Sequence, residues 1–107
     1  MALQVAALSL EMVAALRPLV GRIRRHDRSL ADQLVRAASS VALNIGEAEF
    51  SDPGNKRARF FTAAGSANES LAALRVAVAW GYFAEGEAEA AEALLRRVLA
   101  ILWRLTR

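Results

Sequence analysis

Polar residues that could do chemistry lie in one line along an apolar segment near the middle of the chain. At about 100° per residue, four of them share one edge of a helix: Gln33, Ser40, Asn44 and Glu47. The apolar positions beside them have the spacing of a buried face: Leu34, Ala37, Ala38, Val41 and Ile45. A carboxylate, an amide and a hydroxyl in one line could take part in acid–base chemistry. Polar groups at such an edge need partners or water, so pairing with a facing helix is favoured over catalysis.

The other reactive residue types give no support for catalysis. The chain has no cysteine and a single histidine, His26, which argues against a thiolate site or a shared-imidazole metal site. It has no Gly-rich phosphate loop, no H-E-x-x-H and no Ser-x-x-Lys. Arg22 and His26 stand closer together than the Arg and His of a nuclease signature found in small helical bundles. We predict no catalytic residue, no metal, no cofactor and no small-molecule substrate.

Arginine dominates the basic residues. There are 13 Arg and one Lys, the formal net charge is +3, and the pI is near 10.5. The planar guanidinium suits phosphate and carboxylate. Two groups are candidates for binding nucleic acid or a protein partner: Arg17, Arg22, Arg24, Arg25 and Arg28, and then Arg96, Arg97, Arg104 and Arg107. The same arginines could instead complement helix dipoles, keep the protein soluble or reflect the codon usage of a GC-rich genome.

Four long segments must position these side chains. Apolar periodicity predicts helices over about residues 3–25, 29–49, 54–82 and 86–105, and no alternating β pattern occurs. Pro18 should kink the first helix or divide it near Arg17. Short connections between long helices make them antiparallel neighbours. The chain is therefore predicted to be one all-α domain over residues 1–107, an up-down-up-down antiparallel four-helix bundle.

Capping residues mark where the helices should begin and end. Asp27 or Ser29 should cap the second helix. Ser51 or Asp52 should cap the third, with Pro53 in its first turn. The stretch "GYFAEGE" should end the third helix, and acidic residues in the first turns of the fourth favour its positive dipole end.

The predicted helix over 54–82 has apolar residues on two sides. Larger residues form one stripe: Phe60, Ala64, Ala67, Leu71, Leu74 and Val78. Small residues form a second stripe: Ala63, Ser66, Ser70, Ala73 and Ala77. Small side chains allow close helix approach, so this helix is central in the bundle or the second stripe is an oligomer contact. An alanine-rich exposed face is the alternative.

The first 20 residues bear on where in the cell the protein is located. They are apolar but interrupted by Glu11 and Arg17, so no uncharged stretch is long enough to span a bilayer. No basic segment precedes the apolar one, as a signal peptide would require. We expect a cytoplasmic protein without membrane contact.

Two segments resemble one known family. They are "DQLVRAASSVALNIGEAE" and "RFFTAAGSANESLAALRVAVAWGYF". They are similar to the motifs D-Q-L-x-R-A-x-x-S-x-x-x-N-I-x-E-G and F-x-x-A-x-G-S-x-x-E-x-x-x-x-L of the bacterial four-helix-bundle proteins encoded in intervening sequences of 23S rRNA genes. One departure is that Gly46 precedes Glu47, whereas the family has its glycine where this chain has Ala48.

The resemblance implies an assembly and partners. The family includes accessory variability proteins of diversity-generating retroelements, which are basic homopentamers that bind a reverse transcriptase and nucleic acid, RNA or DNA. It also places six polar residues at motif positions, where facing helices could pair them in a structural network: Gln33, Ser40, Asn44, Glu47, Ser66 and Glu69. We therefore predict a non-enzymatic homo-oligomer, a pentamer, that acts as a nucleic-acid-associated or reverse-transcriptase-associated scaffold. The alternative is a structural protein-interaction bundle that binds no nucleic acid.

Overall fold

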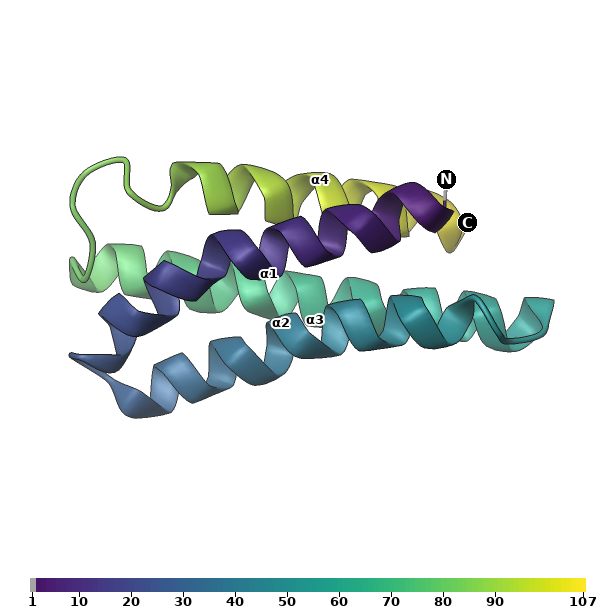
Figure 1. Cartoon of the computed structure of the whole chain (residues 1–107), viewed down its shortest axis with the longest axis horizontal. Coiled ribbons are helices and arrows are strands. Elements are labelled where there is room, and N and C mark those ends of the chain that lie inside the picture. Colours follow the sequence, from purple (N-terminus) through teal and green to yellow (C-terminus); the bar gives the residue numbers. More distant parts are fainter. Residues whose placement is uncertain (1) are drawn as a thin grey trace.

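The computed structural model describes residues 2–107, with side chains from Gln4 onward, and it contains four helices (Figure 1). Their bounds are Ala2–Arg24 (α1), Arg28–Ala48 (α2), Pro53–Trp80 (α3) and Glu89–Leu105 (α4). Each helix packs on the next along the chain, and α4 also packs on α1. The antiparallel four-helix bundle predicted from the sequence is confirmed.

The bundle has two ends that matter for the site. The turn between α1 and α2 and the connection between α3 and α4 lie at one end, which we call the α1–α2 end (Figure 1). The connection between α2 and α3 and the last turn of α4 lie at the other, the α2–α3 end. Two helices begin and two finish at each end, so the helix macrodipoles largely cancel and side chains set the local charge.

All four helices contribute to one apolar core. The largest fully buried apolar side chains come from every helix: Met12, Leu16, Ile23, Leu34, Ile45, Leu74, Leu95, Leu102, Val5, Val41 and Val98. They recur at three- and four-residue intervals, which is the pattern of helices with one face against a core. In α3 the predicted stripe is buried from Phe60 to Leu74, whereas Val78 is half exposed.

The helix ends follow local capping chemistry. Asp27 caps α2, its carboxylate accepting a hydrogen bond from the Leu30 amide at 3.0 Å. Asp52 caps α3 in the same way through Asn55, and Pro53 occupies the first turn. Gly81 ends α3 with φ of 80°, a left-handed conformation that favours glycine.

Two predicted features of the helices differ in the structure. Pro18 lies inside α1, which continues to Arg24, so the helix is not divided near Arg17. Pro18 leaves the carbonyl of Ala14 without a helical partner, and Ala14 is on the exposed side of α1, where water is available. α4 begins at Glu89, three residues later than predicted, because Gly86 has φ of 79° and interrupts any helix before it. A kink at Pro18 stays a prediction.

α1 is also the helix that bears on membrane contact. Over Gln4–Arg24 it is long and apolar enough to cross a bilayer by length and composition, despite Glu11 and Arg17, and it is the one such helix in the described part of the chain. The sequence-based exclusion of a spanning segment was therefore too strict. In the structure the larger side chains on one face of α1, such as Met12 and Leu16, are buried by the other helices, as in the core helix of a folded bundle.

Candidate functional site

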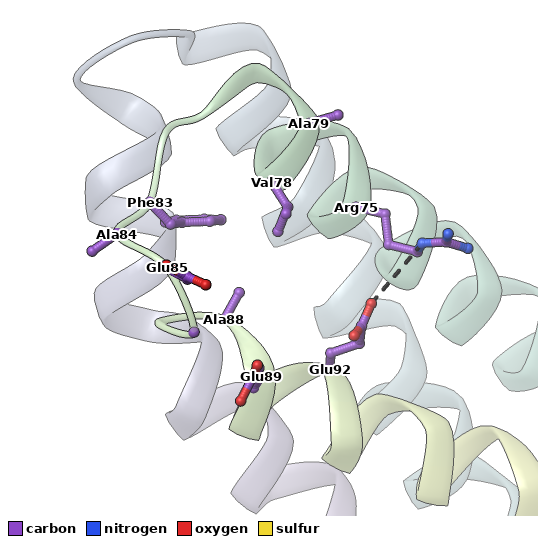
Figure 2. A pocket seen from close by; sticks show the side chains of 10 residues that line it. Arg75, Val78, Ala79, Phe83, Ala84, Glu85, Ala88, Glu89 and Glu92 are labelled. Atoms are coloured by element: carbon purple, nitrogen blue, oxygen red, sulfur yellow. Dashed lines mark ion pairs between the residues drawn. The ribbon is translucent and has the colours of Figure 1, made fainter.

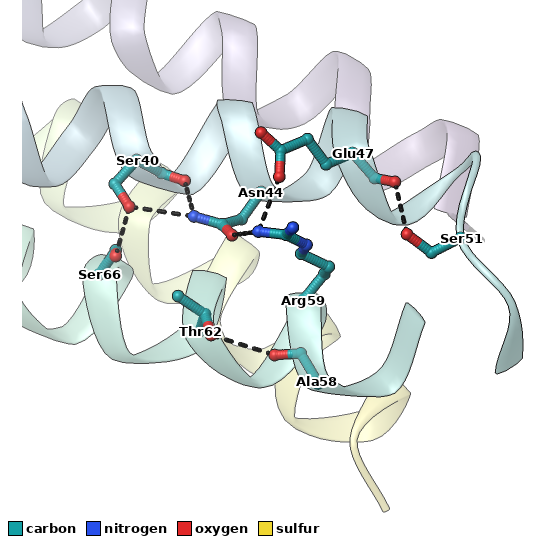
Figure 3. Close-up of polar contacts among 8 residues, drawn as sticks. All are labelled: Ser40, Asn44, Glu47, Ser51, Ala58, Arg59, Thr62 and Ser66. Atoms are coloured by element: carbon teal, nitrogen blue, oxygen red, sulfur yellow. Dashed lines mark hydrogen bonds and ion pairs between the residues drawn. The ribbon is translucent and has the colours of Figure 1, made fainter. Parts of the chain in front are cut away.

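A polar cluster joins α2 to α3 (Figure 3). The Ser66 hydroxyl donates to the Ser40 hydroxyl at 2.9 Å across the helix interface. The Asn44 amide donates to the Ser40 carbonyl at 2.9 Å and to its hydroxyl at 3.1 Å. All three side chains are half-buried, so these bonds lie beside the core, where hydrogen-bonding partners are needed most.

The cluster continues outward through a residue that the sequence did not single out. An Arg59 guanidinium nitrogen lies 2.7 Å from a Glu47 carboxylate oxygen and 3.5 Å from the Asn44 side-chain oxygen (Figure 3). Arg59 stands seven residues before Ser66, so it lies on the same face of α3. This spacing is the one signal that could have found it. Both partners of the ion pair are about half exposed, so it contributes at most about 1 kcal/mol.

The predicted network is therefore brought together in part. One series of contacts joins Ser66, Ser40, Asn44, Arg59 and Glu47. Gln33 and Glu69 are exposed and make no side-chain hydrogen bond or ion pair within the described residues. The hydroxyls bond to each other rather than to a histidine or a free carboxylate, so neither is activated as a nucleophile. The bond from Ser66 to Ser40 links α3 to α2, and that the cluster fixes the register of the two helices stays a prediction.

Replacing Asn44 with Leu tests that role. The change removes the bonds to Ser40 and to Arg59, and a hydrogen bond contributes about 0.5–1.5 kcal/mol net. We expect unchanged helix content by circular dichroism and a melting temperature lower by roughly 4–8 °C. Asn68→Leu is the matched control, because Asn68 is exposed on α3 outside the cluster. Equal melting temperatures for the two variants would contradict a structural role for the cluster.

The small-residue stripe of α3 packs inside this one chain. Its members are buried or half-buried by the chain's own helices: Ala63, Ser66, Ser70, Ala73 and Ala77. The bond from Ser66 to Ser40 shows that this side of α3 faces α2. The prediction of an oligomer contact here is wrong, because a second copy cannot reach side chains that α2 already covers. The other interpretation, a central helix with two packed sides, describes α3.

The nine candidate arginines divide into those that form an ion pair within the chain and those that do not. At the α1–α2 end, Arg22 pairs with Glu87 at 3.1 Å and Arg24 pairs with Asp32 at 2.6 Å. The hydrogen bond from Arg24 holds the pKa of the Asp32 carboxyl below its ordinary value, so this carboxylate is ionised at neutral pH. Arg96 lies 3.7 Å from Glu92 on its own helix. These guanidinium groups are partly neutralised by the chain itself.

The remaining candidates have no carboxylate partner. Six of the nine candidates are exposed and make no ion pair within the described residues: Arg17, Arg25, Arg28, Arg97, Arg104 and Arg107. Arg96 and Arg97 lie in the middle of α4 rather than at its end, because α4 begins at Glu89 and finishes at Leu105. Free arginine charge therefore lies mainly at the two ends of the bundle.

One hollow collects carboxylates instead. It has a volume of about 650 Å³ and lies between the end of α3 and residues 83–89 (Figure 2). Glu85, Glu89 and Glu92 line it, with Arg75 4.0 Å from Glu92. No three His, Cys, Asp or Glu side chains of residues 4–107 are placed to hold a metal ion. Acidic groups in the first turn of α4 stabilise that helix through its dipole, so this hollow needs no ligand.

Large apolar side chains remain on the surface. Nine are exposed: Leu10, Val35, Leu43, Phe50, Phe61, Val76, Val78, Trp80 and Trp103. Leu10 and Val35 line an apolar hollow of about 390 Å³ between α1 and α2. Tyr82 is half-buried and stacks on His26, with ring centroids 4.6 Å apart. Trp80 and Trp103 both expose much of their indole rings on the surface of the bundle.

Comparison with known proteins adds a family to this description. The family model described as 23S rRNA-intervening sequence protein matches residues 1–104. A solved structure of a protein of unknown function from the S23 ribosomal protein family of Bacteroides thetaiotaomicron VPI-5482 is similar, with a TM-score of 0.88 and 20% identity, covering 96% of this chain and 98% of that one. At this identity the likeness shows the fold alone. No curated protein matches. Because the family model covers nearly the whole sequence, the chain belongs to the 23S rRNA-intervening sequence protein family.

Proposed function

We propose that this chain is a non-enzymatic, homo-oligomeric scaffold that binds nucleic acid through the arginines that lack carboxylate partners. The observation that carries the proposal is that six of the nine candidate arginines are exposed and make no ion pair among the described residues. Arginine remains charged at any physiological pH and donates two parallel hydrogen bonds to phosphate. Each phosphate contact also releases condensed counterions, which favours binding at low salt.

Oligomerisation would raise the local positive potential that each chain's modest net charge produces. A net charge of +3 per chain is small, but a ring repeats each arginine group and raises the local positive potential. The apolar hollow that Leu10 and Val35 line supports self-association, because apolar surface grouped in one place on a domain is a common interaction site. A pentamer, which the family resemblance implies, should show a solution mass of about five times the 11.6 kDa chain by light scattering.

A second function is favoured by the same apolar residues. A protein-interaction bundle would use Leu10, Val35 and the hollow between α1 and α2, and its arginines would serve solubility. The reverse transcriptase that the resemblance implies is instead a partner of the scaffold proposed first, and a neighbouring reverse-transcriptase gene together with co-purification would support it. An oligomer that retains neither RNA nor DNA on a filter at about 50 mM salt would favour this second function.

Paired and unpaired arginines at the same end of the bundle provide the test of nucleic-acid binding. Among the residues that the structure describes, Arg25 and Arg28 make no ion pair, whereas Arg22 and Arg24 do. If the unpaired residues each contact one phosphate, Arg25→Gln with Arg28→Gln should lower the slope of log affinity against log salt by about 1.4–1.8. Arg22→Gln with Arg24→Gln is the matched control and should change the slope less. Filter binding over a salt series measures both slopes, and an equal change in the two double variants would contradict the assignment.

A further inference from the structure

An exposed aromatic pair lies where the start of α3 meets the end of α4. The rings of Phe61 and Trp103 meet edge to face, with centroids 5.9 Å apart and an interplanar angle of 80°. Phe61 is 60% exposed and Trp103 is 44% exposed. Such pairs usually lie in cores or interfaces because aromatic rings bury large areas, so a pair this open has ring surface available to a ligand.

A hollow and a positioned cation adjoin the pair. The hollow measures about 470 Å³, and Arg57, Phe61 and Thr106 are among the residues that line it. Arg57 donates from Nε to the Thr106 carbonyl at 2.8 Å, which ties the first turns of α3 to the end of α4. The other guanidinium nitrogens of Arg57 make no ion pair within the described residues. The cation is thus held in place beside the exposed Phe61 ring.

The charged residues next in sequence to those that line this hollow are basic. Lys56 precedes Arg57 and Arg107 follows Thr106, and neither makes an ion pair in the described part of the chain. The carboxylate nearest in sequence, Asp52, already accepts hydrogen bonds from the Asn55 amide at 3.0 Å and its side chain at 2.7 Å. Those bonds hold the Asp52 pKa below its ordinary value. This carboxylate is therefore committed to capping α3 and leaves Arg57 unneutralised.

We infer that the hollow between α3 and α4 binds an unpaired base of a single-stranded nucleic acid, which stacks on Phe61 with Trp103 beside it while Arg57 holds an adjacent phosphate. The inference rests on the proposed function and assigns it a specific site and strand form. Aromatic side chains beside cations are the general means of binding single strands, because every base has a π face. A duplex keeps its bases stacked inside, so the aromatic pair selects single strands.

Tryptophan fluorescence can observe the stack directly. The chain has two tryptophans, and Trp80 lies on the surface near the α1–α2 end. In a Trp80→Phe variant, Trp103 is the one fluorophore of its kind. We expect oligo(dT) or oligo(rU) of about 16 nucleotides to quench it, and a duplex of equal length to quench it less. The complementary variant, Trp103→Phe, reports on Trp80 and should show little quenching.

Affinity measurements separate stacking from charge. Phe61→Leu and Trp103→Leu should each weaken oligo(dT) binding about 5- to 150-fold, the change that corresponds to about 1–3 kcal/mol per stacked base. Their salt slopes should equal that of the wild type, because an aromatic ring displaces no counterion. Arg57→Gln should instead lower the slope by about 0.7. Circular dichroism on each variant confirms that the bundle is folded.

The possible failures are distinguishable. If the wild type retains oligo(dT) but Trp103 is not quenched and both aromatic variants bind normally, this site is overturned while nucleic-acid binding stands. If the wild type retains no nucleic acid at low salt, both the site and the proposed function are overturned. If aromatic substitutions change the oligomer mass and leave oligo(dT) binding intact, the aromatic pair is a protein contact instead.

Discussion

Substituting Ala77 with Glu should unfold much of the protein rather than dissociate an oligomer. Ala77 is fully buried on the side of α3 that faces α2, so the new carboxylate would have neither space nor a partner. We expect a loss of about 4 kcal/mol or more. That is a large share of the roughly 5–15 kcal/mol by which domains of this size are stable. Urea denaturation followed by circular dichroism measures the loss.

Ala72→Glu is the control for this effect. Ala72 lies on the same helix but is exposed, so a carboxylate there stays in water. Its free energy of unfolding should change by about 0.5 kcal/mol or less. A variant Ala77→Glu that keeps the wild-type urea midpoint and merely changes from oligomer to monomer would restore the subunit-contact hypothesis and contradict the packing described above.

Truncating Phe60 should have a second large effect, and its neighbour provides the comparison. Phe60 is 3% exposed in the core, whereas Phe61 faces solvent. Phe60→Ala should cost about 3–5 kcal/mol, because it removes buried apolar contacts and leaves a cavity. Phe61→Ala should cost about 1 kcal/mol or less, the value of an edge-to-face aromatic contact.

The two Phe variants also separate stability from binding. Urea midpoints should fall strongly for Phe60→Ala and slightly for Phe61→Ala. Binding of oligo(dT) below the unfolding temperature should show the opposite order, with Phe61→Ala the weaker binder. Similar losses of stability in both variants would mean that Phe61 is part of the core after all, and would remove the basis for the aromatic site.

Short-range patterns made the helices predictable. Asp27, Asp52 and Pro53 act within one turn of their own position, and the core stripes depend only on helical periodicity. The start of α4 could not be found in this way. Glu87 and Ala88 suit a first helical turn, and only the left-handed backbone at Gly86 shows that the helix begins later.

The site depended on contacts between helices, which periodicity does not contain. The two apolar sides of α3 were evident in sequence, but whether α2 or a second chain covered the small residues required the three-dimensional packing. The same holds for charge. Arg22 and Arg25 are the same residue type and lie three positions apart, so the sequence cannot tell which one is paired. The structure shows that Glu87, which is distant in sequence, pairs with Arg22. Arg59 joined the polar cluster for the same reason.

The order of helix packing has a consequence for how the chain folds. Each helix contacts the one that follows it in the chain. Every pair of consecutive helices can therefore form as a helical hairpin. The contact of α1 with α4 is the main one that joins elements distant in sequence, and it must close a long loop. Bundles with such local contacts fold in microseconds to milliseconds. Little aggregation-prone surface is then exposed for long, although the finished fold keeps several apolar side chains in water.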